Sequence, residues 1–317
     1  ATLEGVASEA SSLADSGEIT PLVEQRLKLY RDEREAIAKA QSGGPDEVVA
    51  HRLADWSWLN HRRYVRHFAG QSRPTRDLGL LKEIVAEQRR YQNDLAKLIA
   101  RQPPGWRADL LSQIEQNLQM YIAELDAIPA ARAAMGAHQR VGVLATIANT
   151  QFGLWRTHFA EKSRRTRRAA LLRRMISQLE SIHAAMIEAR DQGIKSETHL
   201  GNIEKVSSRL TLYQRELNLI EQAAASADPD DLGRALGTEA NEQFAAYRSD
   251  FAGQARTAVD LAALGTICDR LQEIVRNMDT LDRTWARPVN AKNLGVVIDN
   301  LKQYEREHTR IAQARQD

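Results

Sequence analysis

One sequence pattern recurs four times in this chain of 317 residues, at an almost constant spacing. Each copy holds Val or Ile, followed by Leu, Tyr, Glu and Ile at offsets of 4, 7, 10 and 14 residues. The tyrosines lie 91, 92 and 91 residues apart, so we expect a structural unit of about 91 residues that repeats along the chain. The copies comprise Val23, Leu27, Tyr30, Glu33 and Ile37; Ile114, Leu118, Tyr121, Glu124 and Ile128; Val206, Leu210, Tyr213, Glu216 and Ile220; and Val297, Leu301, Tyr304, Glu307 and Ile311.

A second pattern keeps the same period between those copies. It pairs two aromatic residues with an arginine and two apolar residues, and it occurs three times. Apolar residues in both patterns recur at spacings of three and four, which is typical of amphipathic helices. The members are Tyr64, Phe68, Arg73, Leu81 and Ile84; Trp155, Phe159, Arg164, Leu172 and Met175; and Tyr247, Phe251, Arg256, Leu264 and Ile267.

Composition narrows the fold class further. Aromatic residues make up 5% of the chain, and 17 Gly with 8 Pro are few for a sheet-rich fold with many turns. No apolar run approaches the 18 residues or more that a transmembrane helix needs, and a single cysteine, Cys268, excludes an intrachain disulfide. The net charge of +2 gives no overall field that would recruit a nucleic acid, which argues against that class of partner.

The spacing of helix breakers predicts one long helix in each unit. Between Leu144 and Arg190 the only Gly or Pro is Gly153, so we expect a continuous helix through the second copy. A helical stretch of about 55 residues would run roughly 80 Å. In the first copy, Pro74 predicts a kink or local break at the equivalent place. The small residues Ser163 and Thr166 are expected midway along the long helix, where successive short helices meet.

A short helix paired with one twice as long resembles the spectrin-repeat architecture, in which long helices are shared between consecutive bundles. The resemblance covers nearly the whole chain. It implies an all-α fold: an elongated tandem array of antiparallel three-helix coiled-coil bundles, with long helices shared between repeats. The expected parts are a partial helix that completes the first bundle (1–17), repeat 1 (18–103), repeat 2 (104–194), repeat 3 (195–287) and a terminal half repeat (288–317).

The strongest candidate binding feature is a run of arginines in the second copy. It could bind phosphates, a nucleic-acid backbone or an acidic partner. Because the packing seam turns Ser163 and Thr166 inward, the arginines are expected to point outward, and an ordinary solvated helix face is the alternative interpretation. The candidate anion-binding residues are Arg164, Arg165, Arg167, Arg168, Arg173 and Arg174.

Catalytic, metal and cofactor sites have no support in the sequence. There is no paired-cysteine or His-Glu-x-x-His motif, and no glycine-rich phosphate loop follows a credible strand. His67 and His158 occupy equivalent positions one repeat apart, so a rod would hold them tens of ångströms from each other. Cys268 falls at an apolar position and is expected in the core. The chain is therefore predicted to be no enzyme and to need no cofactor.

The repeated Tyr and Glu admit two interpretations. They could form four ligand sites, or they could form a packing seam in which Tyr lies on the apolar stripe and Glu makes a contact within its own helix. The seam is the interpretation that we favour.

The two ends fall inside repeat units, which suggests that the chain is a segment of a longer protein. Incomplete end bundles would expose apolar seams through which copies could associate or protein partners could dock. Trp56 and Trp58 have no aromatic equivalents in the other copies. They are candidate docking residues, or they cover an incomplete bundle.

Three classes of function follow. The leading one is a non-enzymatic helical rod that acts as a structural spacer or a protein–protein interaction scaffold. The alternatives are an extramembrane stalk or sensor region of a larger membrane protein, and a module that binds an anion or polyanion through the Arg164–Arg174 face. The sequence does not decide between a cytoplasmic and a periplasmic location.

Overall fold

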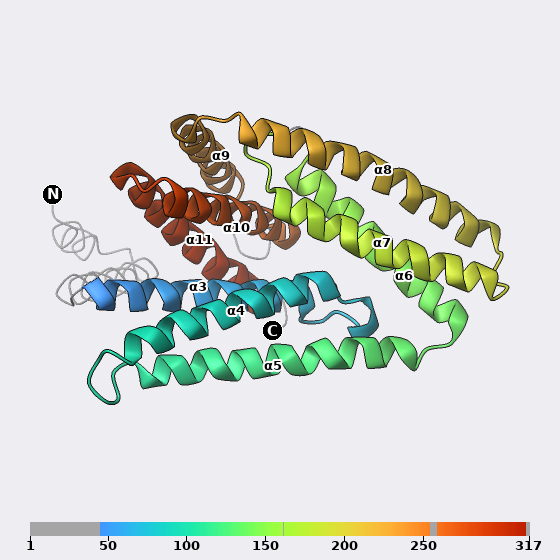
Figure 1. Ribbon diagram of the computed structural model, residues 1–317, viewed down its shortest axis with the longest axis horizontal. Helices are drawn as coiled ribbons and strands as arrows, with labels where there is room; N and C mark the ends of the chain where they lie inside the picture. The colour runs from blue at the N-terminus through green and yellow to red at the C-terminus, as the bar shows by residue number, and fades with distance from the viewer. Residues whose placement is uncertain (1–44, 161, 254–258, 315–317) are drawn as a thin grey trace, which may run out of the picture. The chain divides into compact units, whose positions relative to one another are not determined.

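The computed structural model describes residues 45–160, 162–253 and 259–314, and all regular structure within these ranges is helical. The predicted partial helix at 1–17, the first copy of the tyrosine pattern and Arg256 lie outside them. The α-helices are α3 (Pro45–Phe68), α4 (Leu78–Ile99), α5 (Ala108–Ala133), α6 (Ala137–His158), α7 (Ala169–Asp191), α8 (Glu197–Ala225), α9 (Pro229–Asp250), α10 (Leu261–Thr284) and α11 (Pro288–Ala314), with a 3₁₀ turn at Arg73–Thr75. The all-α prediction is confirmed for this part of the chain (Figure 1).

The described chain divides into two compact units, and several helices contribute to both. The first unit holds residues 45–58 and 88–116, and the second holds residues 59–87 and 117–314 of the described chain. In the first unit, Trp56 is buried and stacks on Tyr91, with ring centroids 6.4 Å apart. Gln88 Nε2 donates to Ser57 Oγ at 2.8 Å, so a buried polar contact reinforces this small core.

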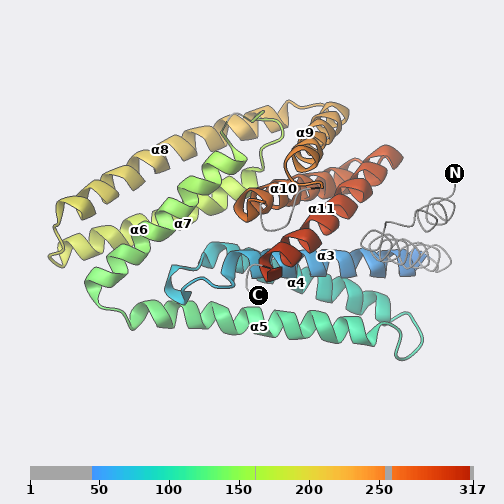
Figure 2. The ribbon, with the colours of Figure 1, turned by 180° about the vertical axis from the view of Figure 1, so that it is seen from behind.

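The second unit contains the larger core. Its central apolar cluster joins α6, α7 and α8, which lie side by side in both ribbon views (Figures 1 and 2). A second cluster packs Phe68 and the start of α4 against Tyr121 and Ile128 of α5. Helix α10 packs against both α9 and α11. Asp260 caps the start of α10 by accepting from the backbone N–H groups of Ala262 and Ala263.

The predicted continuous helix through the second copy is wrong. Helix α6 ends at His158 and α7 begins at Ala169, so two separate helices stand where one long helix was expected. The intervening segment is dense in arginine, and a continuous helix would set Arg164 against Arg167 and Arg168 at repelling three- and four-residue spacings. Thr166 Oγ1 instead donates to the Ser163 carbonyl, a local bond that competes with helical hydrogen bonding.

In the first copy the helix ends at the equivalent place. A 3₁₀ turn follows α3 there, with Pro74 inside it, so the break predicted at this proline is present. The small residues Ser163 and Thr166, expected in the middle of a helix, therefore lie in a connecting segment, as does Ser72 in the first copy.

The expected elongated rod is also wrong for the second unit. In a linear array the first and third copies would not touch. Arg66 of α3 nevertheless donates to Asp269 of α10 at 2.6 Å and pairs with Glu305 of α11. Gln272 of α10 donates to the Leu59 carbonyl of α3 at 3.2 Å. Chain reversals at the breaks bring the copies together, which a rod of shared helices would not allow.

Within the described part of the chain, no helix combines the length and the apolar content needed to cross a bilayer.

Candidate interaction groove

The two sequence patterns contact each other in the second unit. The aromatic residue that opens the second pattern packs on the tyrosine of the first. Trp155 stacks on Tyr213 and Tyr247 on Tyr304, with ring centroids 4.3 and 3.8 Å apart, and Tyr64 packs on Tyr121 at 4.7 Å with its ring tilted by 40°. Burial raises the pKa of Tyr213 and of Tyr304 to about 12. These phenols therefore stay neutral at physiological pH and act as packing groups.

The glutamate of the first pattern pairs with the arginine of the second. Glu124 accepts from Arg73 at 3.1 Å and from Arg76 at 2.6 Å. Glu216 accepts from Arg164 at 2.8 Å, and Arg167 at the next equivalent position also pairs with it. The expectation of a contact within one helix is wrong for Glu124 and Glu216, because each of these arginines comes from a segment between two other helices. Glu307 does make such a contact, since Arg310 of the same helix lies 3.9 Å from it. The two patterns share a period because their residues meet.

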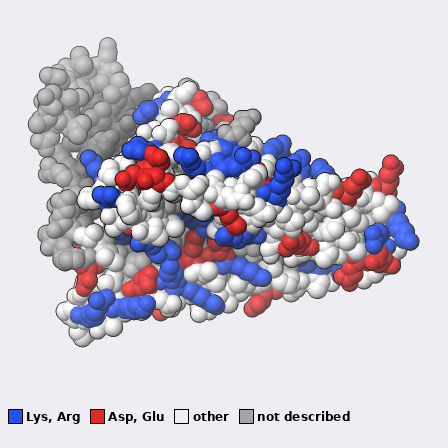
Figure 3. Space-filling model, turned by 45° about the horizontal axis from the view of Figure 1, so that its top comes forward, with Lys and Arg blue, Asp and Glu red and all other residues white. Residues whose placement is uncertain are grey.

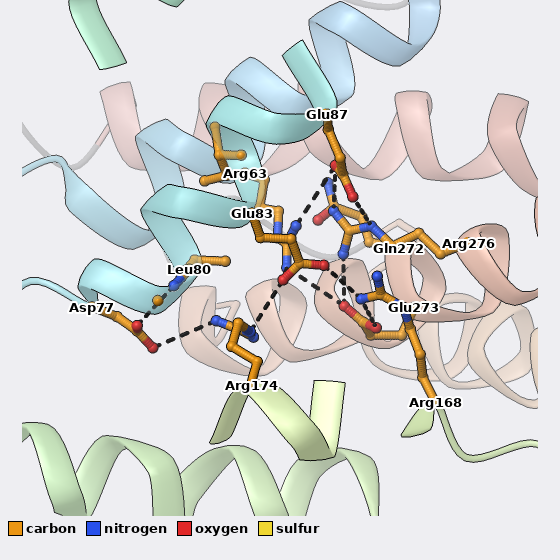
Figure 4. Close-up of polar contacts among 12 residues, drawn as sticks. Arg63, Asp77, Leu80, Glu83, Glu87, Arg168, Arg174, Gln272, Glu273 and Arg276 are labelled. Atoms are coloured by element: carbon orange, nitrogen blue, oxygen red, sulfur yellow. Dashed lines mark hydrogen bonds and ion pairs between the residues drawn. The ribbon is translucent and has the colours of Figure 1, made fainter. Parts of the chain in front are cut away.

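A buried cluster of ion pairs lies where α3, α4, α7 and α10 meet. Glu83 accepts from Arg63 at 3.2 Å, and its carboxylate lies 2.7 Å from Arg168 and 3.1 Å from Arg174 (Figure 4). Glu273 pairs with Arg168 at 3.0 Å and with Arg276 at 2.7 Å. We name these six residues, together with Glu87, the ion-pair cluster.

The cluster is charged although it is enclosed. Burial alone would raise the pKa of Glu83 and of Glu273, but neighbouring arginines outweigh burial and hold both pKa values below the ordinary range. The dominant arginine is Arg63 for Glu83 and Arg168 for Glu273. Removing one member would leave an opposite charge buried without its partner, which is strongly destabilising. This arrangement is a structural anchor whose charges are already satisfied.

Beside the ion-pair cluster lies a half-open groove of about 730 Å³ between α7, the first half of α6, the start of α4 and the end of α5. Apolar side chains of α6 form one wall, including Val141, Leu144 and Ile147. Small side chains of α7 line it at four-residue intervals. The lining residues are Leu78, Gly79, Lys82, Glu83, Arg132, Ala137, Arg140, Val141, Val143, Leu144, Ile147, Arg168, Ala170, Arg174, Ser177, Gln178, Ser181, Ile182, Ala185, Glu188, Ala189 and Gln192. We call this site the α6–α7 groove.

Close approach of α4 to α7 fixes one end of the groove. The backbone N–H of Gly79 donates to Gln178 Oε1 at 3.1 Å. A Cβ at this glycine would collide with that same oxygen, so the contact requires glycine unless the Gln178 side chain moves. The start of α4 is thereby held against α7, and residues of α7 on both sides of this contact line the groove.

The groove is lined by more positive than negative charge. Five of its lining residues are Lys or Arg and two are Glu. Arg168, Arg174 and Glu83 are engaged in the ion-pair cluster, whereas Lys82 and Arg140 are exposed. Arg132 donates to two backbone carbonyls, Pro74 O at 2.8 Å and Arg76 O at 2.7 Å. The rim therefore offers cationic groups beside an apolar wall.

The predicted arginine face divides into inward and outward members. Arg168 and Arg174, expected to point outward, are largely buried in the ion-pair cluster, so that expectation is wrong for them. Arg164, Arg167 and Arg173 pair with Glu216 or Glu221. Arg165 is exposed. Figure 3 shows Lys and Arg side chains beside Asp and Glu side chains on the face in view.

The candidate docking aromatics both belong to the first unit. Trp56 is buried against Tyr91. Trp58 is partly exposed. Neither residue lines the α6–α7 groove.

The two equivalent histidines lie close together, contrary to the expectation that tens of ångströms separate them. His67 Nε2 lies 3.0 Å from Asp269 Oδ1, and His67 and His158 line the same small cavity as Asp269. Burial lowers the pKa of His158 to about 4, with Arg174 and Arg270 adding to the effect against the opposing charges of Glu273 and Asp269. Among the described residues, no group of three His, Cys, Asp or Glu side chains has metal-binding geometry. Cys268 is buried, and burial raises the pKa of its thiol.

Sequence reasoning missed both the ion-pair cluster and the groove. Glu83, Glu273 and Arg63 lie on helices rich in other charges, and nothing in the local pattern separates buried charges from solvated ones. The sequence does contain one feature that points to the groove. Small residues recur every four positions along one face of a helix, at Ser177, Ser181, Ala185 and Ala189.

Comparison with models of known protein families found no match, and comparisons with curated proteins and with solved structures found none either.

Proposed function

We propose that this chain is a non-enzymatic protein–protein interaction scaffold whose recognition element is the α6–α7 groove. The observation that carries the proposal is the groove itself: about 730 Å³ of half-open space walled by apolar side chains of α6 and small side chains of α7. Concave sites that combine an apolar lining with a few polar groups are preferred binding sites. The ionisable residues shared with the ion-pair cluster neutralise one another, which supports binding over catalysis.

We extend the proposal to the architecture. The elements α3–α5, α6–α8 and α9–α11 are proposed to be successive copies of one antiparallel three-helix bundle, with a period of about 91 residues. The equivalent ring contacts of Tyr64, Trp155 and Tyr247 with the three tyrosines support this organisation. Likeness to spectrin repeats is proposed at this level only, as bundles of three helices in tandem.

A polyanion-binding role is the second candidate. The exposure of Arg164 and Arg165 favours this role. Carboxylates oppose it, because they already pair with Arg164 and with the four other candidates, Arg167, Arg168, Arg173 and Arg174. Heparin binding that falls steeply with salt, and that is lost in a variant with Arg164→Gln and Arg165→Gln, would support it. Unchanged binding in that variant would end it. Self-association through end bundles and a stalk or sensor role in a larger membrane protein stay predictions from the sequence.

The scaffold proposal is tested by selecting partners for the groove directly. A display library of 21-residue helical peptides, with a randomised apolar face and a Gln and Ser opposite face, is selected on the full chain. Selected peptides are then measured against Ser181→Trp, which places a large side chain in the groove at an exposed position. We expect at least a tenfold loss of affinity. A second variant, Ala185→Leu, fills the same space more conservatively.

The control variant is Ser207→Trp, an exposed serine on α8 that does not line the groove. Binding that survives both groove variants, or a selection that yields no binder at all, would contradict the proposed function. Helicity and thermal unfolding of each variant show whether it is folded.

A further inference from the structure

We infer that the occupant of the α6–α7 groove is an amphipathic helix of another protein that carries acidic residues beside its apolar face. This inference rests on the proposed function and adds the shape and the charge of the partner. Three features of the groove lead to it: its length, the residues along α7 and its charge.

The length of the groove favours an extended partner. The residues of α7 that line it run from Ala170 to Ala189. At 1.5 Å per residue this is about 29 Å of helix, the span of roughly five turns. A compact small molecule would occupy only part of that length, whereas an antiparallel or parallel helix would follow it.

The residues along α7 suit close approach by a second helix. Ser177, Ser181, Ala185 and Ala189 line the groove at four-residue intervals. Rows of residues four apart form the ridges and grooves through which helices pack, and small side chains there allow interaxial distances near the short end of 8–10 Å. Val141 and Leu144 of α6 stand at the side, where they can contact apolar side chains of the incoming helix. This is the general mode in which an amphipathic helix binds in a groove.

The positive charge at the edge of the groove favours a partner with negative charge. Among the described residues, no carboxylate makes a hydrogen bond or an ion pair with three cations at its edge, Lys82, Arg132 and Arg140. The carboxylate of Glu83 is held by arginines, and Glu188 is the other acidic lining residue. Glutamates or aspartates that flank the apolar face of a bound helix would meet these cations, and a basic helix would be repelled.

Two further peptide libraries test the inference. They share one randomised apolar face, and the opposite face is Glu and Gln in one library and Lys and Gln in the other. We expect the acidic library to give binders to the full chain that lose at least tenfold in affinity for Ser181→Trp. The basic library is expected to give binders at least tenfold weaker, or none.

Charge reversal at the rim provides the matched comparison. The double variant Lys82→Glu with Arg140→Glu should weaken the best acidic peptide at least tenfold and reduce the dependence of its affinity on salt. Arg165→Glu with Lys195→Glu makes the same change in net charge at exposed positions that do not line the groove, and it should leave affinity within twofold.

The outcomes separate the two proposals. Binders that depend on the groove but show no preference for the acidic face would overturn this inference and leave the scaffold proposal standing. Binders that ignore Ser181→Trp would overturn both. Oleate, an anionic amphiphile, serves as a competitor: binding of oleate in the groove without any groove-dependent peptide would also overturn the inference in favour of a small ligand.

Discussion

The ion-pair cluster and the α6–α7 groove are neighbours in the second unit and share Glu83, Arg168 and Arg174. They differ in whether their other charged side chains are paired and buried or exposed to solvent. In the ion-pair cluster every charged side chain has an oppositely charged partner and is largely buried. At the edge of the groove, Lys82 and Arg140 stay exposed beside apolar walls.

The difference shows what separates an anchor from a binding surface in this protein. Buried charges that neutralise one another join helices from distant parts of the sequence, and they leave nothing for a ligand. Small residues on α7 leave space that no segment of the described second unit fills. We therefore expect changes in the ion-pair cluster to alter stability, and changes in the groove to alter binding.

The largest effect is expected from Glu83→Gln. Arg63, Arg168 and Arg174 would then lose a shared counter-charge in an enclosed place, and the free energy of unfolding should fall by about 3–5 kcal/mol. Urea unfolding followed by circular dichroism measures the change. Glu221→Gln is the control, since its pair with Arg173 is exposed on both sides and should contribute less than about 1 kcal/mol. Equal losses in both variants would contradict a structural role for the cluster.

Acidification should destabilise the second unit before its carboxylates titrate. Because burial lowers the pKa of His158 to about 4, the unfolded chain takes up a proton near pH 6.5 while the folded chain does not. The contribution of neutral His158 to the free energy of unfolding is fully present above pH 6.5. It falls by at most about 1.4 kcal/mol per pH unit as the pH drops towards 4. His308, whose pKa burial also lowers to about 4, adds a loss of the same sign.

Thermal unfolding between pH 7 and pH 5 measures this loss, and His158→Asn should make the profile flatter. A profile that keeps its full slope in that variant would exclude His158 as a cause. Below pH 4.5, protonation of Glu83 and Glu273, whose folded pKa values are lowered, should remove further stability.

Groove variants should change stability little. Ser181 is exposed, so Ser181→Trp replaces a side chain that makes no buried contact, and the free energy of unfolding should stay within about 1 kcal/mol of the parent. The same urea titration used for Glu83→Gln measures it. A loss as large as that of the cluster variant would mean that the groove is part of the core.

The smallest effect is expected at Arg165. Arg165→Gln removes an exposed cation and should change the unfolding free energy by no more than about 0.5 kcal/mol. Arg168→Gln, three residues further along the same arginine run, removes one of the partners of both Glu83 and Glu273 and should cost several times as much. Similar values for the two variants would contradict the division of this run into inward and outward members.

Periodicity alone predicted the helical class and the main core positions. Tyr121, Tyr213 and Tyr304 are buried as the apolar stripe required, and Phe159 is fully buried. Periodicity could not reveal that the chain turns between His158 and Ala169, because that turn contains no Gly or Pro. It depends on repulsion between neighbouring arginines and on their contacts with Glu216, which is distant in sequence.

The missed turn accounts for the other errors. A continuous helix leads to a rod, and a rod keeps the first copy away from the third. Once the chain reverses, Arg66 reaches Asp269, and His67 and His158 share one cavity. The groove follows from the same reversal, since it lies between α7 and the preceding α6. The ion pair of Arg66 with Asp269 and the cavity shared by His67 and His158, each between distant segments, were not visible in the repeated patterns.

The central claim is that the α6–α7 groove receives a partner while the ion-pair cluster remains closed, and amide hydrogen exchange tests it most directly. The full chain is measured with and without a saturating acidic-library peptide. The account predicts slower exchange in residues 137–147 of α6 and 177–192 of α7, with no change in the part of α10 around Glu273. Protection confined to other helices, or faster exchange around Glu273, would contradict it.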